Sequence, residues 1–262
     1  MTYQIFQIDA FTDAVFKGNP ACVVPLKQWL PDTVLLNIAK ENAVAETAFF
    51  IDLGDKIHLR WFTPDIEMDL CGHATLATAH ALKTILNYTK SEIIFTTLSG
   101  DLSVTCNEGL YTLNFPTRNP IASELPELIS KAIAKQPKLV LKARDYLLVY
   151  ENESDVANIQ IDRQILNKIN LDPGGIIITA KGDNSDFVSR FFTSQASLFE
   201  DFVTGSAHCS LIPYWSKVLN KKQLMAYQIS ERVGQLFCED KGERVLISGK
   251  AKTYSIGNFY LD

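Results

Sequence analysis

Arg60-Trp61-Phe62-Thr63-Pro64 and Arg190-Phe191-Phe192-Thr193-Ser194 are two versions of one short pattern, separated by 130 residues in a chain of 262. The same kinds of elements surround both copies in the same order, with strand patterns before them and a helical pattern after them. A displacement of about half the chain length is what duplication of a half-length domain produces. The repeat therefore predicts two related halves of mixed α and β class.

Each copy of the pattern is followed by a glycine that begins a helical stretch. Gly72 lies ten residues after Phe62, and Gly205 lies thirteen residues after Phe192. A helix N-terminus presents unpaired backbone N–H groups and a partial positive charge, so it binds carboxylates or phosphates. One such glycine is more simply explained by a tight turn. A matched pair favours a small anionic substrate held between two helix ends at a domain interface.

The composition excludes several classes of protein. Hydrophobic residues make up 47% and charged residues 21% of the chain, which are ordinary globular values. A net charge of −5 gives no general attraction to nucleic acid or anionic membranes. No apolar run approaches the ~18 residues of a membrane span, and five scattered cysteines without a C-x-x-C pair fit a reducing compartment. We therefore expect a cytoplasmic protein that binds neither nucleic acid nor membrane.

The proline-containing stretch from 116 to 126 is typical of a connection between domains. We expect a first domain over residues 1–116 and a second over 117–251, which is a structural repeat of the first. The second glycine-led helix contains Pro213, which we expect to interrupt it.

Four side chains near the two glycines are candidates for chemistry. His73 directly follows the first glycine, where a structural role is as good an interpretation as a functional one. Asp201 and Ser206 flank the second glycine, where either could be a helix cap. Glu46 stands alone where a polar segment gives way to an apolar strand. That placement suits general acid/base catalysis, although it also fits a solvated helix end.

Other chemistries lack their sequence signatures. The usual nucleotide-binding, hydrolase and zinc-protease motifs are missing. His73 and His80 lie seven residues apart, which is not adjacent-turn metal-ligand spacing, and His208-Cys209 is a weak hint in isolation. We expect no metal and no cofactor.

Cys71 bears on a competing hypothesis, a cofactor-free racemase with one thiol before each glycine. Aligning Gly72 with Gly205 places Cys71 opposite Thr204, so the second thiol is missing. The pattern therefore favours proton movement by a single base over stereoinversion by a thiol pair.

Five motifs follow one another along the chain: Gly18-Asn19-Pro20-Ala21, Glu46-Thr47-Ala48-Phe49, Arg60-Trp61-Phe62-Thr63-Pro64, Leu70-Cys71-Gly72-His73-Ala74-Thr75 and Glu200-Asp201 followed by Val203-Thr204-Gly205-Ser206-Ala207-His208. In register, they resemble the motifs of the PhzF phenazine-biosynthesis family, and the resemblance spans residue 5 to about 260. It implies a diaminopimelate-epimerase-like fold: two pseudo-symmetric α/β domains, each a curled, barrel-like sheet around a central helix. It also implies an active site between them, a homodimer, and a C-terminal strand within 252–262 that returns to the first domain.

The characterised type member of that family isomerises trans-2,3-dihydro-3-hydroxyanthranilate by moving a proton between ring carbons. The resemblance implies a cofactor-independent isomerase of a small carboxylate-bearing metabolite. It implies these roles: Glu46 as proton shuttle, His73 and Asp201 as polar partners of the substrate, Ser206 as hydroxyl donor, and Gly72, Gly205 and Asn19 as substrate-binding residues.

Two departures from the family pattern bear on which substrate fits. Family members commonly have Ser where this chain has Ala45, and Pro where it has Phe202. Many relatives also have no assigned substrate, so fold and site do not establish the reaction. An epimerase or racemase of an amino or hydroxy acid and a non-catalytic ligand- or protein-binding homologue stay open as alternatives.

Overall fold

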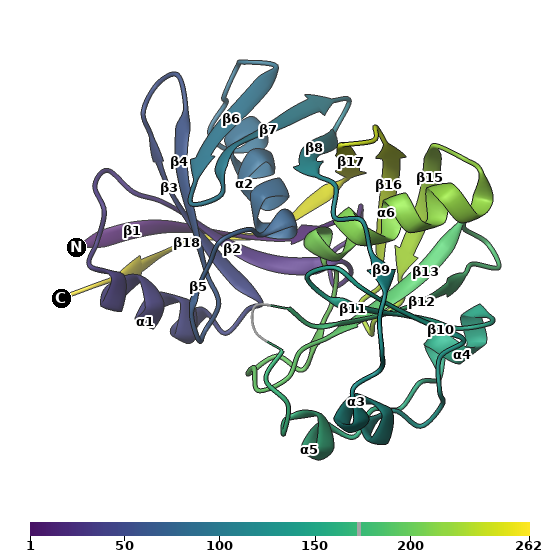
Figure 1. Ribbon diagram of the computed structural model, residues 1–262. Coiled ribbons are helices and arrows are strands. Elements are labelled where there is room, and N and C mark those ends of the chain that lie inside the picture. Colours follow the sequence, from purple (N-terminus) through teal and green to yellow (C-terminus); the bar gives the residue numbers. More distant parts are fainter. Residues whose placement is uncertain (172–173) are drawn as a thin grey trace. The chain divides into compact units, whose positions relative to one another are not determined.

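A computed structural model describes residues 1–171 and 174–262 (Figure 1). The chain forms two compact units, the first of Met1–Asn114 with Ser248–Asp262 and the second of Phe115–Ile247. Among the described residues, no helix is long and apolar enough to cross a membrane.

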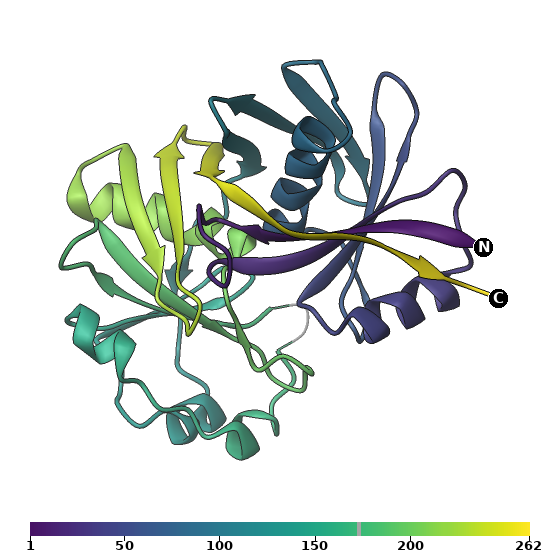
Figure 2. The ribbon, with the colours of Figure 1, turned by 180° about the vertical axis from the view of Figure 1, so that it is seen from behind.

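The first unit is built on a mixed sheet of eight main strands. Their pairing order is β18–β1–β2–β3–β4–β6–β7–β8, parallel at β2/β3 and β4/β6 and antiparallel elsewhere. β18 pairs with β1 along the whole length of β1, so the two ends of the chain run side by side (Figure 2). The strands are β1 (Thr2–Ala10), β2 (Asn19–Pro25), β3 (Glu46–Asp52), β4 (Ile57–Phe62), β6 (Glu92–Thr97), β7 (Gly100–Asn107), β8 (Leu110–Pro116) and β18 (Ala251–Tyr260).

Two helices cover this sheet in different ways. Helix α2 (Gly72–Thr84) is buried on every side from Gly72 to Leu82 and packs against β1, β2, β3 and β18. Its alanines and threonines let strands approach its backbone closely, as its small residues predict. Helix α1 (Asp32–Asn42) is amphipathic and buries only Leu35, Ile38 and Ala39. It ends at Ala43, whose left-handed backbone turns the chain into β3.

The second unit repeats this arrangement. Its strands pair in the order β9–β10–β11–β12–β13–β15–β16, again with two parallel pairs, β11/β12 and β13/β15. Helix α6 (Gly205–Leu219) has the position in the chain order that α2 has in the first unit. The strands are β9 (Ile121–Ala122), β10 (Leu139–Lys142), β11 (Tyr146–Val149), β12 (Ile176–Lys181), β13 (Phe187–Phe192), β15 (Gln223–Gln228), β16 (Gly234–Asp240) and β17 (Arg244–Gly249).

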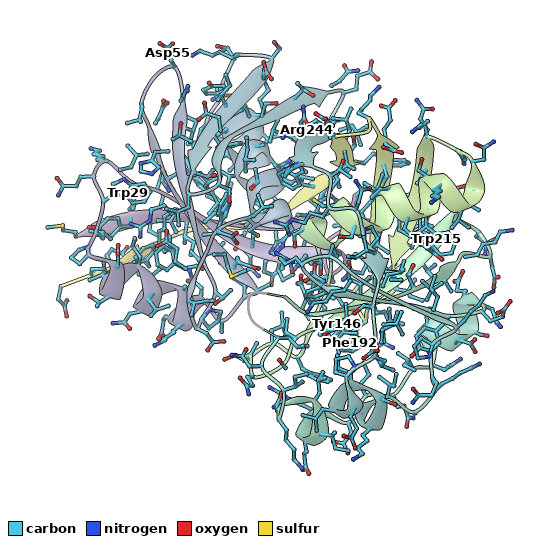
Figure 3. All side chains as sticks on the ribbon, viewed as in Figure 1. Trp29, Asp55, Tyr146, Phe192, Trp215 and Arg244 are labelled. Atoms are coloured by element: carbon cyan, nitrogen blue, oxygen red, sulfur yellow. The ribbon has the colours of Figure 1, made fainter. Side chains whose placement is uncertain are left out.

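Three short helices, α3 (Glu127–Ala132), α4 (Glu153–Ala157) and α5 (Arg163–Leu166), belong to the second unit. Ile129, Val156 and Leu166 from these helices bury their side chains in one core with Leu148 and Ile176. On α6, Trp215 (labelled in Figure 3) is buried, stacks on Phe187 and donates its indole N–H to Thr179 Oγ1 at 2.9 Å.

The repeated arginine pattern makes the same contact in both units. In the first, Arg60 on β4 forms a bidentate ion pair with Glu67 of the two-residue strand β5 (Glu67–Met68), with two N···O distances of 2.7 Å. In the second, Arg190 on β13 pairs in the same way with Glu200 of β14 (Glu200–Asp201), again at 2.7 Å twice. Each ion pair holds in place the short strand that precedes a central helix.

Pro213 does not interrupt α6, which continues to Leu219. A proline at this position removes the hydrogen bond to the carbonyl four residues earlier, that of Cys209. The backbone N–H of Arg118 donates to that carbonyl instead, at 3.0 Å. The lost helix bond is thus replaced by a bond from another segment, which no periodicity in the helix itself could indicate.

Candidate active site

Glu46 is the first residue of β3, directly after the chain leaves α1. β3 runs parallel to β2, and Glu46 lies opposite Ala21 in that pairing. The polar head of Glu46 is therefore held at the edge of a buried strand, and 13% of its side chain is exposed. The preceding Ala45 is buried. Glu46 is not a solvated helix-end residue.

The start of α2 brings His73 to Glu46. Cys71 is extended and precedes the helix, so that His73 is the second helical residue and points into the interior with 2% of its side chain exposed. His73 Nε2 lies 3.0 Å from Glu46 Oε2. At this distance the carboxylate and the imidazole form an ion pair when the ring is protonated.

The other ring nitrogen of His73 has two neighbours. The side-chain amide nitrogen of Asn19, the first residue of β2, lies 3.1 Å from His73 Nδ1. The sulfur of Cys71 lies 3.6 Å from the same nitrogen. All three side chains are buried. The structure thus brings Asn19, Glu46, Cys71 and His73 into one cluster at the N-terminus of α2.

Burial and charge act in opposite directions on this cluster. Burial raises the pKa of the Cys71 thiol to about 11, and Glu46 adds to that rise, so the thiol is protonated at neutral pH. Burial alone would lower the pKa of His73, but the acidic groups beside it, Cys71 and Glu46, raise it well above its ordinary value. Because the thiol is neutral, we attribute the rise to the Glu46 carboxylate. The Glu46 carboxylate therefore favours a proton on the imidazole of His73.

The same residues are of types that bind transition metals. Ligand atoms of Glu46, Cys71 and His73 all lie within 4.8 Å of one another. Metal ligands must be deprotonated, whereas the pKa of Cys71 is about 11 and the lone pair of His73 Nδ1 faces the Asn19 amide. The arrangement fits proton handling better than metal binding.

A second polar cluster lies at the N-terminus of α6. Asp201 Oδ2 accepts a hydrogen bond from Thr204 Oγ1 at 2.6 Å. The buried Gln228 on β15 binds this loop at three points: its amide nitrogen donates to the Asp201 carbonyl and to Thr204 Oγ1, and its oxygen accepts from the Thr204 N–H. Thr204, the counterpart of Cys71, thus holds the Asp201 carboxylate in place.

Ser206, the second residue of α6, lies beside a cation that the sequence did not identify. Arg144 Nη2 donates to Ser206 Oγ at 3.0 Å, and Arg144 Nε donates to the fully buried carboxylate of Asp145 at 3.1 and 3.2 Å. The Gly175 N–H also donates to Asp145, at 2.9 Å. A guanidinium beside a helix N-terminus favours anions.

The predicted site residues therefore fall into two groups. Asn19, Glu46, Gly72 and His73 lie together in the first unit, and Asp201, Gly205 and Ser206 lie together in the second. Sequence analysis missed Arg144 and Gln228. Neither belongs to the repeated pattern, and each reaches its partner across more than twenty residues of chain.

Comparison with known proteins identifies the family. A family model described as phenazine biosynthesis-like protein matches residues 8–257. The chain belongs to the PhzF family. An isomerase of Pseudomonas aeruginosa, named as uncharacterized, is 44% identical over 261 residues that cover all of both chains. The crystal structure of a PhzF-family phenazine biosynthesis protein from Enterococcus faecalis has a TM-score of 0.94 and 45% identity, and covers all of both chains.

A more distant PhzF-like architecture is found in a hydroxyproline epimerase from Agrobacterium vitis. It is 10% identical, with a TM-score of 0.59 over 98% of this chain and 92% of that one, which shows a shared fold alone. The predicted fold class, mixed α/β of the diaminopimelate-epimerase-like type, is confirmed. The prediction of an isomerase of the PhzF family is also confirmed at that level.

Proposed function

We propose that this PhzF-family isomerase moves a proton on a small, cyclic, carboxylate-bearing metabolite similar to trans-2,3-dihydro-3-hydroxyanthranilate, without a cofactor. The observation that carries the proposal is the Glu46–His73 contact, 3.0 Å between a partly exposed carboxylate and a buried imidazole. A carboxylate in such surroundings can take a proton from carbon and return it to another carbon of the same substrate. Glu46 is the residue that does so.

His73 assists by binding a polar group of the substrate next to Glu46. In the second unit, the cluster of Asp201, Ser206 and Arg144 has the chemistry to bind charged groups: the carboxylate of Asp201 suits an amine, and the guanidinium of Arg144 with the hydroxyl of Ser206 suits a carboxylate. The backbone N–H groups of Gly72 and Gly205 begin helices α2 and α6, and they add to carboxylate binding.

The remaining expectations belong to this proposal. Relatives of the family share the whole length of the chain, and from that resemblance we propose a homodimer. The five free cysteines, of which four are buried, support a reducing compartment such as the cytoplasm. The repeated strand pairings support an origin by duplication of a half-length domain.

Proton NMR in D₂O tests the reaction. Purified protein is incubated with trans-2,3-dihydro-3-hydroxyanthranilate, beside a Glu46→Gln variant. We expect isomerisation by the wild type and a loss of about a thousandfold in the variant, because general acid/base catalysis contributes ~10²–10⁴ in rate. Full turnover by Glu46→Gln would refute the role of Glu46. No turnover by the wild type would refute this substrate, and other cyclic amino or hydroxy acids that fit beside Ala45 and Phe202 would be tried next.

A further inference from the structure

The side chain of Asn19 has no exposed surface. Its amide nitrogen faces His73 Nδ1 at 3.1 Å. An amide N–H₂ group can only donate, so the ring nitrogen that faces it must accept. In the observed arrangement His73 Nδ1 therefore has no proton.

Cys71 supports the same assignment independently. Its sulfur lies 3.6 Å from His73 Nδ1, and its thiol is protonated at neutral pH because its pKa is about 11. An S–H group is a weak donor. Two donors from different elements, β2 and the residue before α2, thus converge on one lone pair. A neutral imidazole whose Nδ1 accepts has its proton on Nε2.

We propose that Asn19 is a positioning residue that, with Cys71, holds His73 as the Nε2–H tautomer beside Glu46. The inference rests on the proposed function for its catalytic consequence. Nε2 lies 3.0 Å from Glu46 Oε2, so a proton on Nε2 lies beside the Glu46 carboxylate. That N–H is placed to donate to an oxygen of the substrate, while the neighbouring carboxylate moves the proton.

The arrangement also explains why Cys71 is present although Thr204 occupies the matching position of the second unit. The thiol has no partner thiol to act with as a second base, but it is a donor to His73 Nδ1. The Glu46 carboxylate raises the pKa of His73, so the ring takes up a second proton below that pKa. This proton lies on Nδ1 and requires the Asn19 amide to turn its oxygen toward it. A carboxylate in place of the amide would accept that proton without any rearrangement.

The tautomer is measured directly by ¹⁵N NMR of histidine-labelled protein, without substrate. The chain has four histidines, and the His73 resonances are those lost in a His73→Gln variant. In the neutral ring of the wild type we expect Nδ1 at the unprotonated position and Nε2 at the protonated one. In Asn19→Asp we expect both nitrogens protonated, and in Asn19→Ala a mixture of tautomers. A protonated Nδ1 in the neutral wild-type ring, or an unchanged pattern in both variants, would overturn the proposal.

Turnover provides the second readout. We expect Asn19→Ala to lower kcat by about ten- to a hundredfold, the usual effect of removing a group that orients a functional histidine, with little change in KM. Asn42→Ala is the matched control, because Asn42 also donates its amide to a neighbouring side chain, Thr47 Oγ1 at 3.1 Å, but does not touch His73. Equal losses in kcat for both variants would assign Asn19 a merely structural role. If the wild type does not turn over the test substrate, the proposed function fails, and the ¹⁵N pattern still decides the tautomer.

Discussion

The N-termini of α2 and α6 have the same backbone arrangement but different side chains. Both are reached through a short strand held by an arginine–glutamate pair, and both begin with a glycine. At α2 the flanking residues are Cys71 and His73, which form a cluster with Glu46. At α6 the equivalents are Thr204 and Ser206, which are fixed by Asp201 and Arg144.

The comparison separates what the two helix starts share from what differs between them. The backbone and the supporting arginine–glutamate pairs are alike in both units. The two residues that flank the glycine differ between the units: Cys71 and His73 in the first, Thr204 and Ser206 in the second. The side chains at the start of α2 favour a proton on a histidine, whereas those at the start of α6 include a carboxylate and a neighbouring guanidinium that suit charged groups.

The largest expected effect is a difference in kinetics between variants of the two carboxylates, Glu46 and Asp201. Glu46→Gln removes the proposed proton carrier and should reduce kcat by about a thousandfold. Asp201→Asn keeps the hydrogen bond from Thr204 Oγ1 and should act mainly on KM, by about tenfold. Steady-state kinetics of both variants decide the matter. A larger loss of kcat in Asp201→Asn than in Glu46→Gln would contradict the roles proposed for the two carboxylates.

Acid should weaken both units through a buried histidine on each central helix. Burial lowers the pKa of His80 on α2 and of His208 on α6 to about 4, and Lys252 adds to the effect at His80. Each ring is neutral in the folded state but titrates near 6.5 when unfolded. The stability that this contributes is complete above pH 6.5 and is lost as pH falls from 6.5 through 4. The loss is about 3 kcal/mol for each histidine at most.

Urea unfolding between pH 7 and pH 4.5 measures this loss. His80→Gln and His208→Gln should each flatten the dependence of the free energy of unfolding on pH, and by similar amounts. A slope equal to that of the wild type in either variant would show that the histidine concerned does not control the acid sensitivity of its unit.

The arginine–glutamate pairs offer a matched comparison of stability. In each pair the arginine side chain is 15% exposed and the glutamate 23% or 21% exposed. Arg60→Met and Arg190→Met each leave a half-buried carboxylate unpaired, so each should lower the free energy of unfolding by about 2 kcal/mol. Lys56→Met is the control, because the ion pair of Lys56 with Asp101 is half exposed. It should change the free energy of unfolding by less than about 1 kcal/mol. Similar losses for all three would contradict a special role for the repeated pattern.

The smallest effect is expected from making the two helix starts alike. Thr204→Cys restores a thiol before each glycine, as a two-base racemase would need. We expect no stereoinversion, because the Cys71 thiol is a protonated donor to His73 rather than a base. The variant loses the hydrogen bond to Asp201, about 1 kcal/mol. Chiral analysis of a turned-over or α-deuterated substrate tests this, and inversion by the variant would restore the racemase hypothesis.

Sequence patterns placed most of the elements but not all their limits. The short, largely apolar runs at 57–62, 92–97, 187–192 and 244–249 predict strands, and they form β4, β6, β13 and β17. The similar run at 226–231 predicts a strand there, but the strand is β15 at Gln223–Gln228, because its position is set by pairing with β16 and β13. The two-residue strands β5 and β14 have no period to detect.

The sequence by itself determined the repeat, the mixed class and the chemical types at the site, because these depend on spacing and residue type along the chain. Only the tertiary structure decided which groups face one another. It placed the Asn19 amide on His73 Nδ1, put Arg144 beside Ser206, and replaced the helix bond lost at Pro213 with one from Arg118. Such contacts join segments far apart in the chain, and their distances follow from the packing of strands and helices rather than from any local pattern.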